Sequence, residues 1–139
     1  NGVPDATDVL NASSPDADHN GIPDECENAW RVPGTIQISK AAPGTGTVRI
    51  SWEPSLCANQ EDYGIYEGIL GDWYSHTRNT CTAIGSVTNS SISTAPGDTY
   101  YLVVPFNANR EGSYGTDSGL VERPKGDLVC APSQVLTCP

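Results

Sequence analysis

Basic residues are scarce in this 139-residue chain. Lys and Arg together number 7 against 17 Asp and Glu, which gives a formal net charge of −10. Because nucleic-acid binding needs Lys and Arg clustered on one face, this composition opposes it, and we expect no nucleic-acid partner. Long apolar runs are missing too. None approaches the ~20 residues that a membrane helix needs, so we expect no membrane span.

Catalytic signatures are also missing. The chain has two His, and neither His19 nor His76 lies beside a nucleophile motif. The G-x-S-x-G elbow and the glycine patterns of phosphate and dinucleotide sites are absent. Glu61, Asp62 and Glu111 are isolated acids in expected loops, where a solvated carboxylate is far more common than a catalytic one. The sequence therefore predicts that the chain is not an enzyme.

The five cysteines contain no C-x-x-C pair, which opposes a zinc site. Cys57 and Cys81 fall in one expected domain, and we predict a disulfide between them. It would close a loop of roughly 25 residues and stabilise the fold by about 3 kcal/mol. Cys130 and Cys138 can then close the C-terminal tail on itself, although alternative pairings stay open. Cys26 then remains, either as a free thiol or as an intermolecular bridge.

An acidic loop near the N-terminus is the most informative segment. Residues 16–27 fit the calcium-loop pattern D-x-[DN]-x-[DN]-G-x5-E at every constrained position. Calcium takes six to eight oxygen ligands, and a glycine at the sixth position allows the sharp turn. The alternative is an acidic turn in a solvated linker. We predict one Ca2+, held by Asp16, Asp18, Asn20, the Ile22 carbonyl, Asp24 and Glu27.

Residues 1–8 repeat residues 20–27 at a shift of nineteen, and such a period marks a tandem array. Asn1, the Val3 carbonyl, Asp5 and Asp8 supply the second half of a calcium loop. Four oxygen groups fall short of a full calcium shell. We therefore expect that the chain is cut from a longer protein or that a neighbouring molecule completes this half-site.

Prolines distinguish these loops from an ordinary EF-hand pair. Pro15 opposes an entering helix, and Pro4 and Pro23 have no N–H to donate to a partner loop. The segment resembles thrombospondin type 3 repeats, or the calcium arrays that link domains in secreted bacterial proteins. The resemblance implies a calcium-stabilised segment. Since such loops fill in millimolar extracellular calcium, we expect an extracellular or cell-surface location.

From Gly34 onward the pattern changes to short alternating strands separated by turn signals. Many short strands with no helical stretch between them predict an antiparallel sandwich. The expected strands are 35–39, 47–52, 63–70, 82–84, 91–93, 99–106 and 113–122.

Three of these segments resemble a fibronectin type III domain: residues 48–54 its second strand with a core Trp, 63–67 its third, and 101–113 its sixth. The resemblance implies an all-β, immunoglobulin-like sandwich. Pro105 departs from the family pattern, so we expect a bulge or an edge position there. The predicted division is a calcium-binding segment (1–33), the fibronectin type III-like sandwich (34–124) and a Cys-containing tail (125–139).

The order of these parts resembles the C-terminal ends of exported bacterial proteins. It predicts a non-catalytic, calcium-stabilised structural or adhesive module, with other protein chains or cell-surface components as partners. One alternative is the subunit of an extracellular filament with calcium-assisted self-association. Another is an accessory module of a secreted hydrolase, serving as a spacer or binding carbohydrate. Tyr63, Tyr66, Trp73 and Tyr74 are candidates for sugar stacking, although we expect core packing for Tyr66 and for one of Trp73 and Tyr74.

Overall fold

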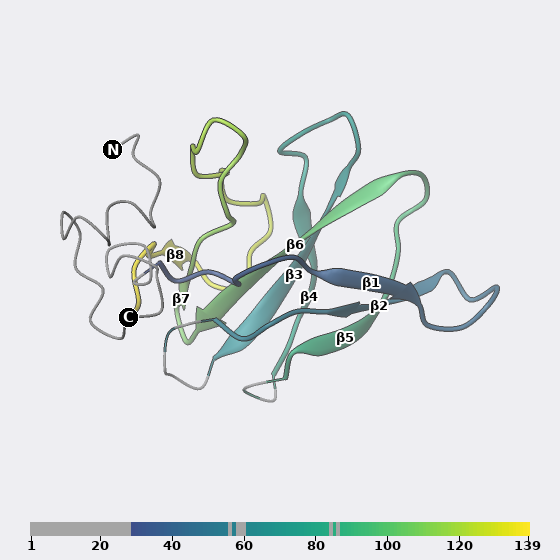
Figure 1. Ribbon diagram of the computed structural model, residues 1–139, viewed down its shortest axis with the longest axis horizontal. Coiled ribbons are helices and arrows are strands. Elements are labelled where there is room, and N and C mark those ends of the chain that lie inside the picture. The colour runs from purple at the N-terminus through teal and green to yellow at the C-terminus, as the bar shows by residue number, and fades with distance from the viewer. Residues whose placement is uncertain (1–28, 56, 58–60, 84, 86) are drawn as a thin grey trace, which may run out of the picture.

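A computed structural model describes residues 29–55, 57, 61–83, 85 and 87–139 (Figure 1). This part of the chain is all-β. No helix in it is long and apolar enough to cross a membrane. Its strands are β1 (Gln37–Lys40), β2 (Thr47–Ser51), β3 (Asp62–Ile69), β4 (Thr77–Cys81), β5 (Asn89–Ser93), β6 (Thr99–Asn107), β7 (Arg110–Glu111) and β8 (Ser133–Gln134).

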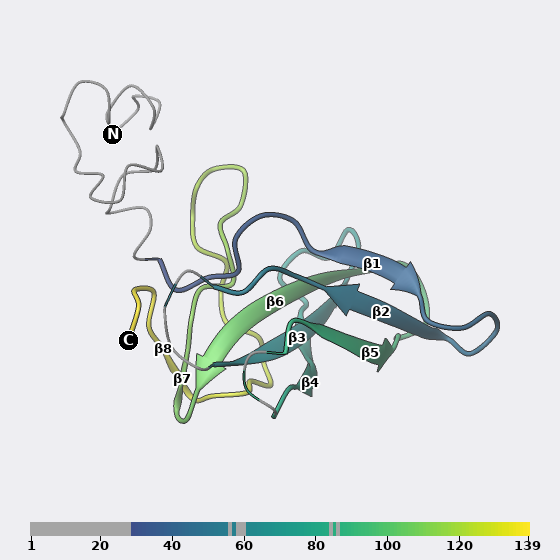
Figure 2. The ribbon, with the colours of Figure 1, turned by 60° about the horizontal axis from the view of Figure 1, so that its bottom comes forward.

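The strands form two sheets, which confirms the predicted all-β class and is consistent with a sandwich (Figure 2). One sheet has the order β1-β2-β5 and is antiparallel throughout. The other has the order β4-β3-β6-β7-β8, in which only β7 and β8 run parallel.

The core between the sheets follows from the alternation along the strands, since residues two apart face the same side. Ile50 of β2 and Ile92 of β5 meet Ile65 of β3 and Val103 of β6. Trp52 packs at the end of β2 with its ring centroid 5.3 Å from that of Tyr63.

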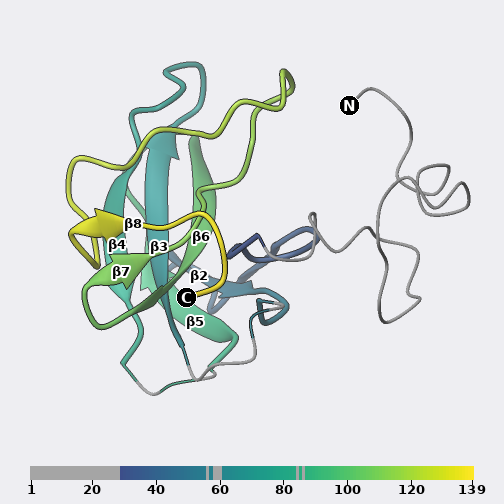
Figure 3. The same cartoon turned by 90° about the vertical axis from the view of Figure 1, so that its left-hand side faces the viewer.

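The other face of β3 is buried as well. Tyr66 and Val104 form a second cluster with Tyr114, and Val129 and Cys130 of the C-terminal tail pack against it. Figure 3 shows the tail crossing this outer side of the five-stranded sheet, before β8 pairs with β7. The tail thus covers the sheet face that lies away from β1-β2-β5.

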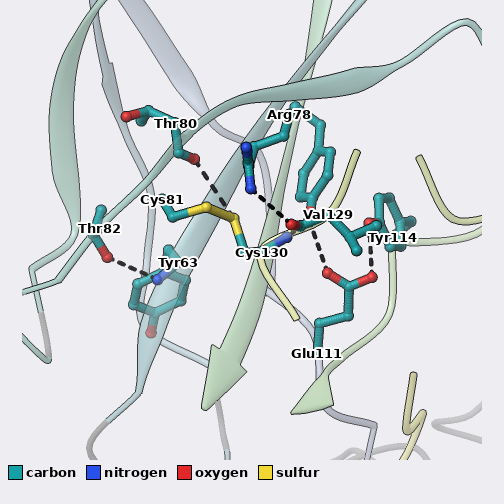
Figure 4. The surroundings of a disulfide bond; sticks show 10 residues. Tyr63, Arg78, Thr80, Cys81, Thr82, Glu111, Tyr114, Val129 and Cys130 are labelled. Atoms are coloured by element: carbon teal, nitrogen blue, oxygen red, sulfur yellow. Dashed lines mark hydrogen bonds between the residues drawn. A yellow bond between two sulfur atoms is a disulfide. The ribbon is translucent and has the colours of Figure 1, made fainter. Parts of the chain in front are cut away.

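Both predicted disulfides are wrong. Cys57 bonds to Cys138 and Cys81 bonds to Cys130, with Cα–Cα distances of 5.4 and 5.9 Å. Cys81 ends β4 opposite Gly64, on the outer face that the tail covers (Figure 4). Both bonds therefore attach the tail to the sandwich, whereas sequence proximity had favoured pairs within each part. Cys26 lies outside the described residues.

Two strand predictions are also wrong. The strand in this region is β4, which ends at Cys81, so Thr82 and Ala83 of the expected strand 82–84 follow it, and Ile84 lies outside the described residues; the Thr82 hydroxyl accepts a hydrogen bond from the Tyr63 N–H at 2.8 Å. The strand expected at 113–122 is a loop with a single bridge between Thr116 and Glu122. The chain leaves the sheet at this point because the Ser113 N–H donates to the Trp30 carbonyl oxygen at 2.7 Å.

Pro105 causes no bulge, since β6 pairs with β3 in continuous register. Its carbonyl oxygen accepts the Gly112 N–H at 2.7 Å, so the missing N–H of Pro105 lies on the same side of the strand. The β6–β7 ladder has already ended at Glu111 there. Proline is accommodated because this side of β6 has become a local edge.

Trp30 connects the start of the described chain to its end. Its side chain is fully buried. Its backbone N–H donates to the Leu136 oxygen at 2.9 Å, and its indole N–H donates to Glu61. A bridge between Ala29 and Thr137 lies beside it. The entry to the sandwich is therefore held by the tail.

Candidate functional site

All ten predicted calcium ligands lie outside the described residues: Asn1, Val3, Asp5, Asp8, Asp16, Asp18, Asn20, Ile22, Asp24 and Glu27. Within the described ranges, no group of three or more His, Cys, Asp or Glu side chains is placed to hold a metal ion. The calcium site therefore stays a prediction.

Glu111 is fully buried, so the expectation of a solvated carboxylate is wrong for it. Its two oxygens accept hydrogen bonds from the Tyr66 hydroxyl at 2.8 Å and the Tyr114 hydroxyl at 2.9 Å (Figure 4). The Tyr66 hydroxyl also accepts the Cys130 N–H at 3.0 Å. Burial raises the pKa of Tyr66 to about 12 and raises the pKa of Tyr114 as well. Glu111 thus joins β7, β3 and the loop after β7.

Glu61 is buried too, which is again contrary to expectation. Its carboxylate accepts hydrogen bonds from the Trp30 indole N–H and from the Tyr63 hydroxyl, the latter at 3.0 Å. Burial is the main cause that raises the pKa of Tyr63 to about 12. The third acid, Asp62, is only half-buried, and it accepts a hydrogen bond from the Gly85 N–H at 2.9 Å.

His76 is buried between the sheet and the chain that precedes the tail. Its Nε2 lies 2.7 Å from the Pro124 carbonyl oxygen, and its Nδ1 lies 3.0 Å from the Tyr100 hydroxyl. Because a carbonyl oxygen only accepts, Nε2 carries a proton. His76 therefore joins separate segments of the fold, as Glu61 and Glu111 do.

An aromatic hollow of about 520 Å³ lies on the surface beside the β3–β4 turn. Trp73 and Tyr74 are both well exposed, at 61% and 48%. The expectation that one of them is in the core is therefore wrong, whereas Tyr63 and Tyr66 are buried. The hollow is lined by Trp73, Tyr74, Tyr100, Tyr101, Leu102, Asp117, Ser118 and Arg123.

Hydrogen bonds fix the rings of this aromatic hollow. The Tyr74 N–H donates to the Tyr100 hydroxyl, and the Tyr74 hydroxyl donates to Asp117 Oδ2, both at 3.1 Å. Trp73 packs on Tyr100 with a centroid distance of 5.5 Å. Sequence reasoning missed Tyr100, Asp117 and Arg123, because they come from β6 and the loop after β7, far along the chain from Trp73.

Asp117 organises that loop. Its Oδ1 accepts the N–H groups of Val121 at 3.0 Å and Gly119 at 2.8 Å. These backbone hydrogen bonds, followed by the one from Tyr74, hold the pKa of Asp117 below its usual value. In turn, the hydrogen bond to Asp117 raises the pKa of Tyr74. The hollow thus presents fixed aromatic rings beside an ionised carboxylate.

Comparison of the chain with known protein families, curated proteins and solved structures finds no match.

Proposed function

We propose that this chain is a non-catalytic, calcium-stabilised extracellular module with a structural or adhesive role. The observation that carries the proposal is the pair of disulfides Cys57–Cys138 and Cys81–Cys130. Structural disulfides form and persist in oxidising compartments, so they favour an extracellular or cell-surface location. Both bonds join the sandwich to the tail, and such cross-links stabilise the folded state of an extracellular module.

A fibronectin type III-like identity for the sandwich is supported by the positions of the three resembling segments. Residues 48–54, 63–67 and 101–113 overlap β2, β3 and β6, the second, third and sixth strands along the described chain. Trp52, the expected core Trp, is buried between the sheets.

A non-catalytic role is supported by the way the buried ionisable groups are used. Glu61, His76 and Glu111 each hydrogen-bond to groups that hold separate segments together. A catalytic acid or base must instead reach a bound substrate.

Calcium binding by residues 1–27 is supported by the chemistry of the donor set. Carboxylate, amide and carbonyl oxygens are the ligands that Ca2+ prefers. Residues 1–33 carry seven acidic side chains and one basic side chain, an excess that a bound cation offsets. The segment joins the sandwich at Trp30, which is fully buried.

Calorimetric titration of the whole chain with Ca2+ tests this proposal. Wild type is expected to bind Ca2+ at millimolar concentration or below, and Asp18→Ala is expected to lose binding at the complete loop. Asp98→Ala removes an exposed acid outside the loop and should bind like wild type. Absence of binding at millimolar Ca2+, or unchanged binding by Asp18→Ala, contradicts the calcium site.

Light scattering with and without EDTA separates the module from the filament alternative. A module that uses Ca2+ only internally keeps the same assembly state under both conditions. If Asn1, Val3, Asp5 and Asp8 complete their shell on a neighbouring molecule, EDTA disperses the assembly, because chelation removes ligands shared by two chains.

A further inference from the structure

We propose that the aromatic hollow binds a neutral carbohydrate through stacking on Trp73 and Tyr74. This inference rests on the adhesive role proposed above and names the chemical class of the partner. It also matches the carbohydrate-binding form of the accessory-module alternative.

The hydroxyls of Tyr74 and Tyr100 in the hollow are already hydrogen-bonded within the protein. The Tyr74 hydroxyl is bound to Asp117, and the Tyr100 hydroxyl is bound to the Tyr74 N–H and to His76. The aromatic rings therefore offer a ligand flat apolar surface, mainly the exposed indole of Trp73. The C–H face of a pyranose ring is flat and apolar in the same way, so the two surfaces suit one another.

The backbone at Tyr74 is strained, and its φ of 77° places a bulky residue in the left-handed region. Such a conformation costs on the order of 1–3 kcal/mol and persists only where surrounding contacts enforce it. Here the backbone N–H and the hydroxyl of Tyr74 are both anchored. These contacts offset the strain and hold the exposed Tyr74 ring in one position. A ring that is already fixed before binding loses less conformational entropy when the ligand binds.

The polar groups of the hollow favour hydroxyl-bearing ligands. Asp117 accepts hydrogen bonds and Arg123 donates them, and both line the same hollow. A sugar hydroxyl both donates and accepts, so it can satisfy either group. The carbonyl oxygens of a proline-rich peptide, the other common ligand of aromatic grooves, only accept, so they can pair with Arg123 but not with Asp117. The net charge of −10 disfavours acidic polysaccharides.

Tryptophan fluorescence offers a direct measurement on the unaltered chain. Trp30 and Trp52 are buried, with 0% and 6% exposure, so acrylamide quenching reports mainly on Trp73. The probes are cellohexaose, mannohexaose and laminarihexaose at millimolar concentration, with a proline-rich decapeptide as the competing class. We expect at least one hexasaccharide to protect the exposed Trp from quenching. Protection by none of them, or by the peptide alone, overturns the proposal.

Calorimetry on matched variants then locates the site. Trp73→Ala should weaken binding of the protecting hexasaccharide by about tenfold or more, the scale of a lost aromatic contact. Ile38→Ala, at an apolar position on the other sheet that is 49% exposed, should bind like wild type. Unchanged binding by Trp73→Ala overturns the assignment. Because Ca2+ titration is a separate measurement, failure of sugar binding with calcium binding intact rejects this inference alone.

Discussion

At the scale of single residues, two buried acids connect segments of the described chain through hydrogen bonds. Glu111 accepts hydrogen bonds from two tyrosine hydroxyls, and Glu61 accepts from an indole N–H and a third tyrosine hydroxyl. Each acid has one donor that is distant in sequence, Trp30 for Glu61 and Tyr66 for Glu111, and one donor a few residues along its own segment. These residues therefore act as polar cross-links inside a small β-fold.

The substitution Glu111→Gln tests this cross-link by replacing one carboxylate oxygen with an NH2 group. The amide keeps one acceptor oxygen but turns an NH2 group toward the other tyrosine hydroxyl, which leaves a buried polar group poorly satisfied. We expect a loss of about 1–3 kcal/mol in the free energy of unfolding, measured by urea denaturation. Glu53→Gln, at an exposed position, should change it by less than about 0.5 kcal/mol. Equal effects of the two substitutions would contradict the cross-link.

Alkaline pH should destabilise the fold through the same tyrosines. Burial raises the pKa of Tyr63 and of Tyr66 from 10.0 to about 12. A group whose pKa is higher in the folded state contributes its full stabilisation below the unfolded pKa, and this contribution is lost as the pH rises through the folded pKa. The free energy of unfolding should therefore fall between about pH 10 and 12. Urea denaturation across this range measures it.

Tyr66→Phe provides the control for the pH dependence. It removes one titrating hydroxyl, so its free energy of unfolding should fall less steeply with pH than that of wild type. A wild-type stability that stays flat up to pH 12 would show that these hydroxyls titrate alike in the folded and unfolded chains.

At the scale of elements, β7 is short because the backbone of Trp30 lies where the strand would continue. The chain leaves the sheet at Gly112, where the Trp30 backbone lies against it. A Cβ on Gly112 would overlap the Trp30 carbonyl oxygen, which is backbone and cannot move aside. Only glycine at position 112 lets these two segments of the chain approach this closely.

Gly112→Ala should accordingly destabilise the fold by several kcal/mol, through displacement of Trp30 or of β7. Gly119→Ala is the matched control, since neither Gly112 nor Gly119 has a left-handed φ. A Cβ at Gly119 would meet only the side chain of Asp117, at 3.3 Å. Thermal unfolding compares the two. A control that loses as much stability as Gly112→Ala would contradict the overlap.

The strands were predictable where local alternation decides them. The patterns at 47–52, 63–70 and 99–106 predicted β2, β3 and β6 to within one residue at each end. The disulfides, the loop at 113–122 and the aromatic hollow were not predictable. Each depends on segments that are distant in sequence, such as Cys57 with Cys138 or Trp73 with Asp117. Alternation within a strand carries no information about what covers its outer face.

At the scale of the whole molecule, the tail is a third layer fastened by two covalent bonds. The disulfides span 81 and 49 residues of sequence, and in the chain-entropy model each stabilises the fold by about 4 kcal/mol. Hydrogen bonds from Arg78 to the Val129 and Leu128 oxygens add to the attachment.

Non-reducing peptide mapping should therefore recover Cys57 with Cys138 and Cys81 with Cys130. The double substitution Cys81→Ser/Cys130→Ser should lower the free energy of unfolding by about 4 kcal/mol and expose the outer face around Tyr66. Protease cleavage within the tail should become faster in this variant than in Cys57→Ser/Cys138→Ser. Recovery of Cys57 linked to Cys81 would contradict the arrangement.

The Cys57–Cys138 bond also determines how the protein responds to a mechanical pull. Tension applied between Trp30 and Cys138 reaches Cys57 along the backbone and then passes directly through the sulfur atoms to Cys138. The segment from Trp30 to Cys57 has ~27 residues and extends to about 90 Å. Without the disulfide, the roughly 108 residues from Trp30 to Cys138 would extend to about 370 Å. β3 to β8 lie within the covalently closed loop and cannot be drawn out while this bond is intact. The Cys57–Cys138 bond therefore limits how far the protein lengthens under force to the segment that carries β1 and β2.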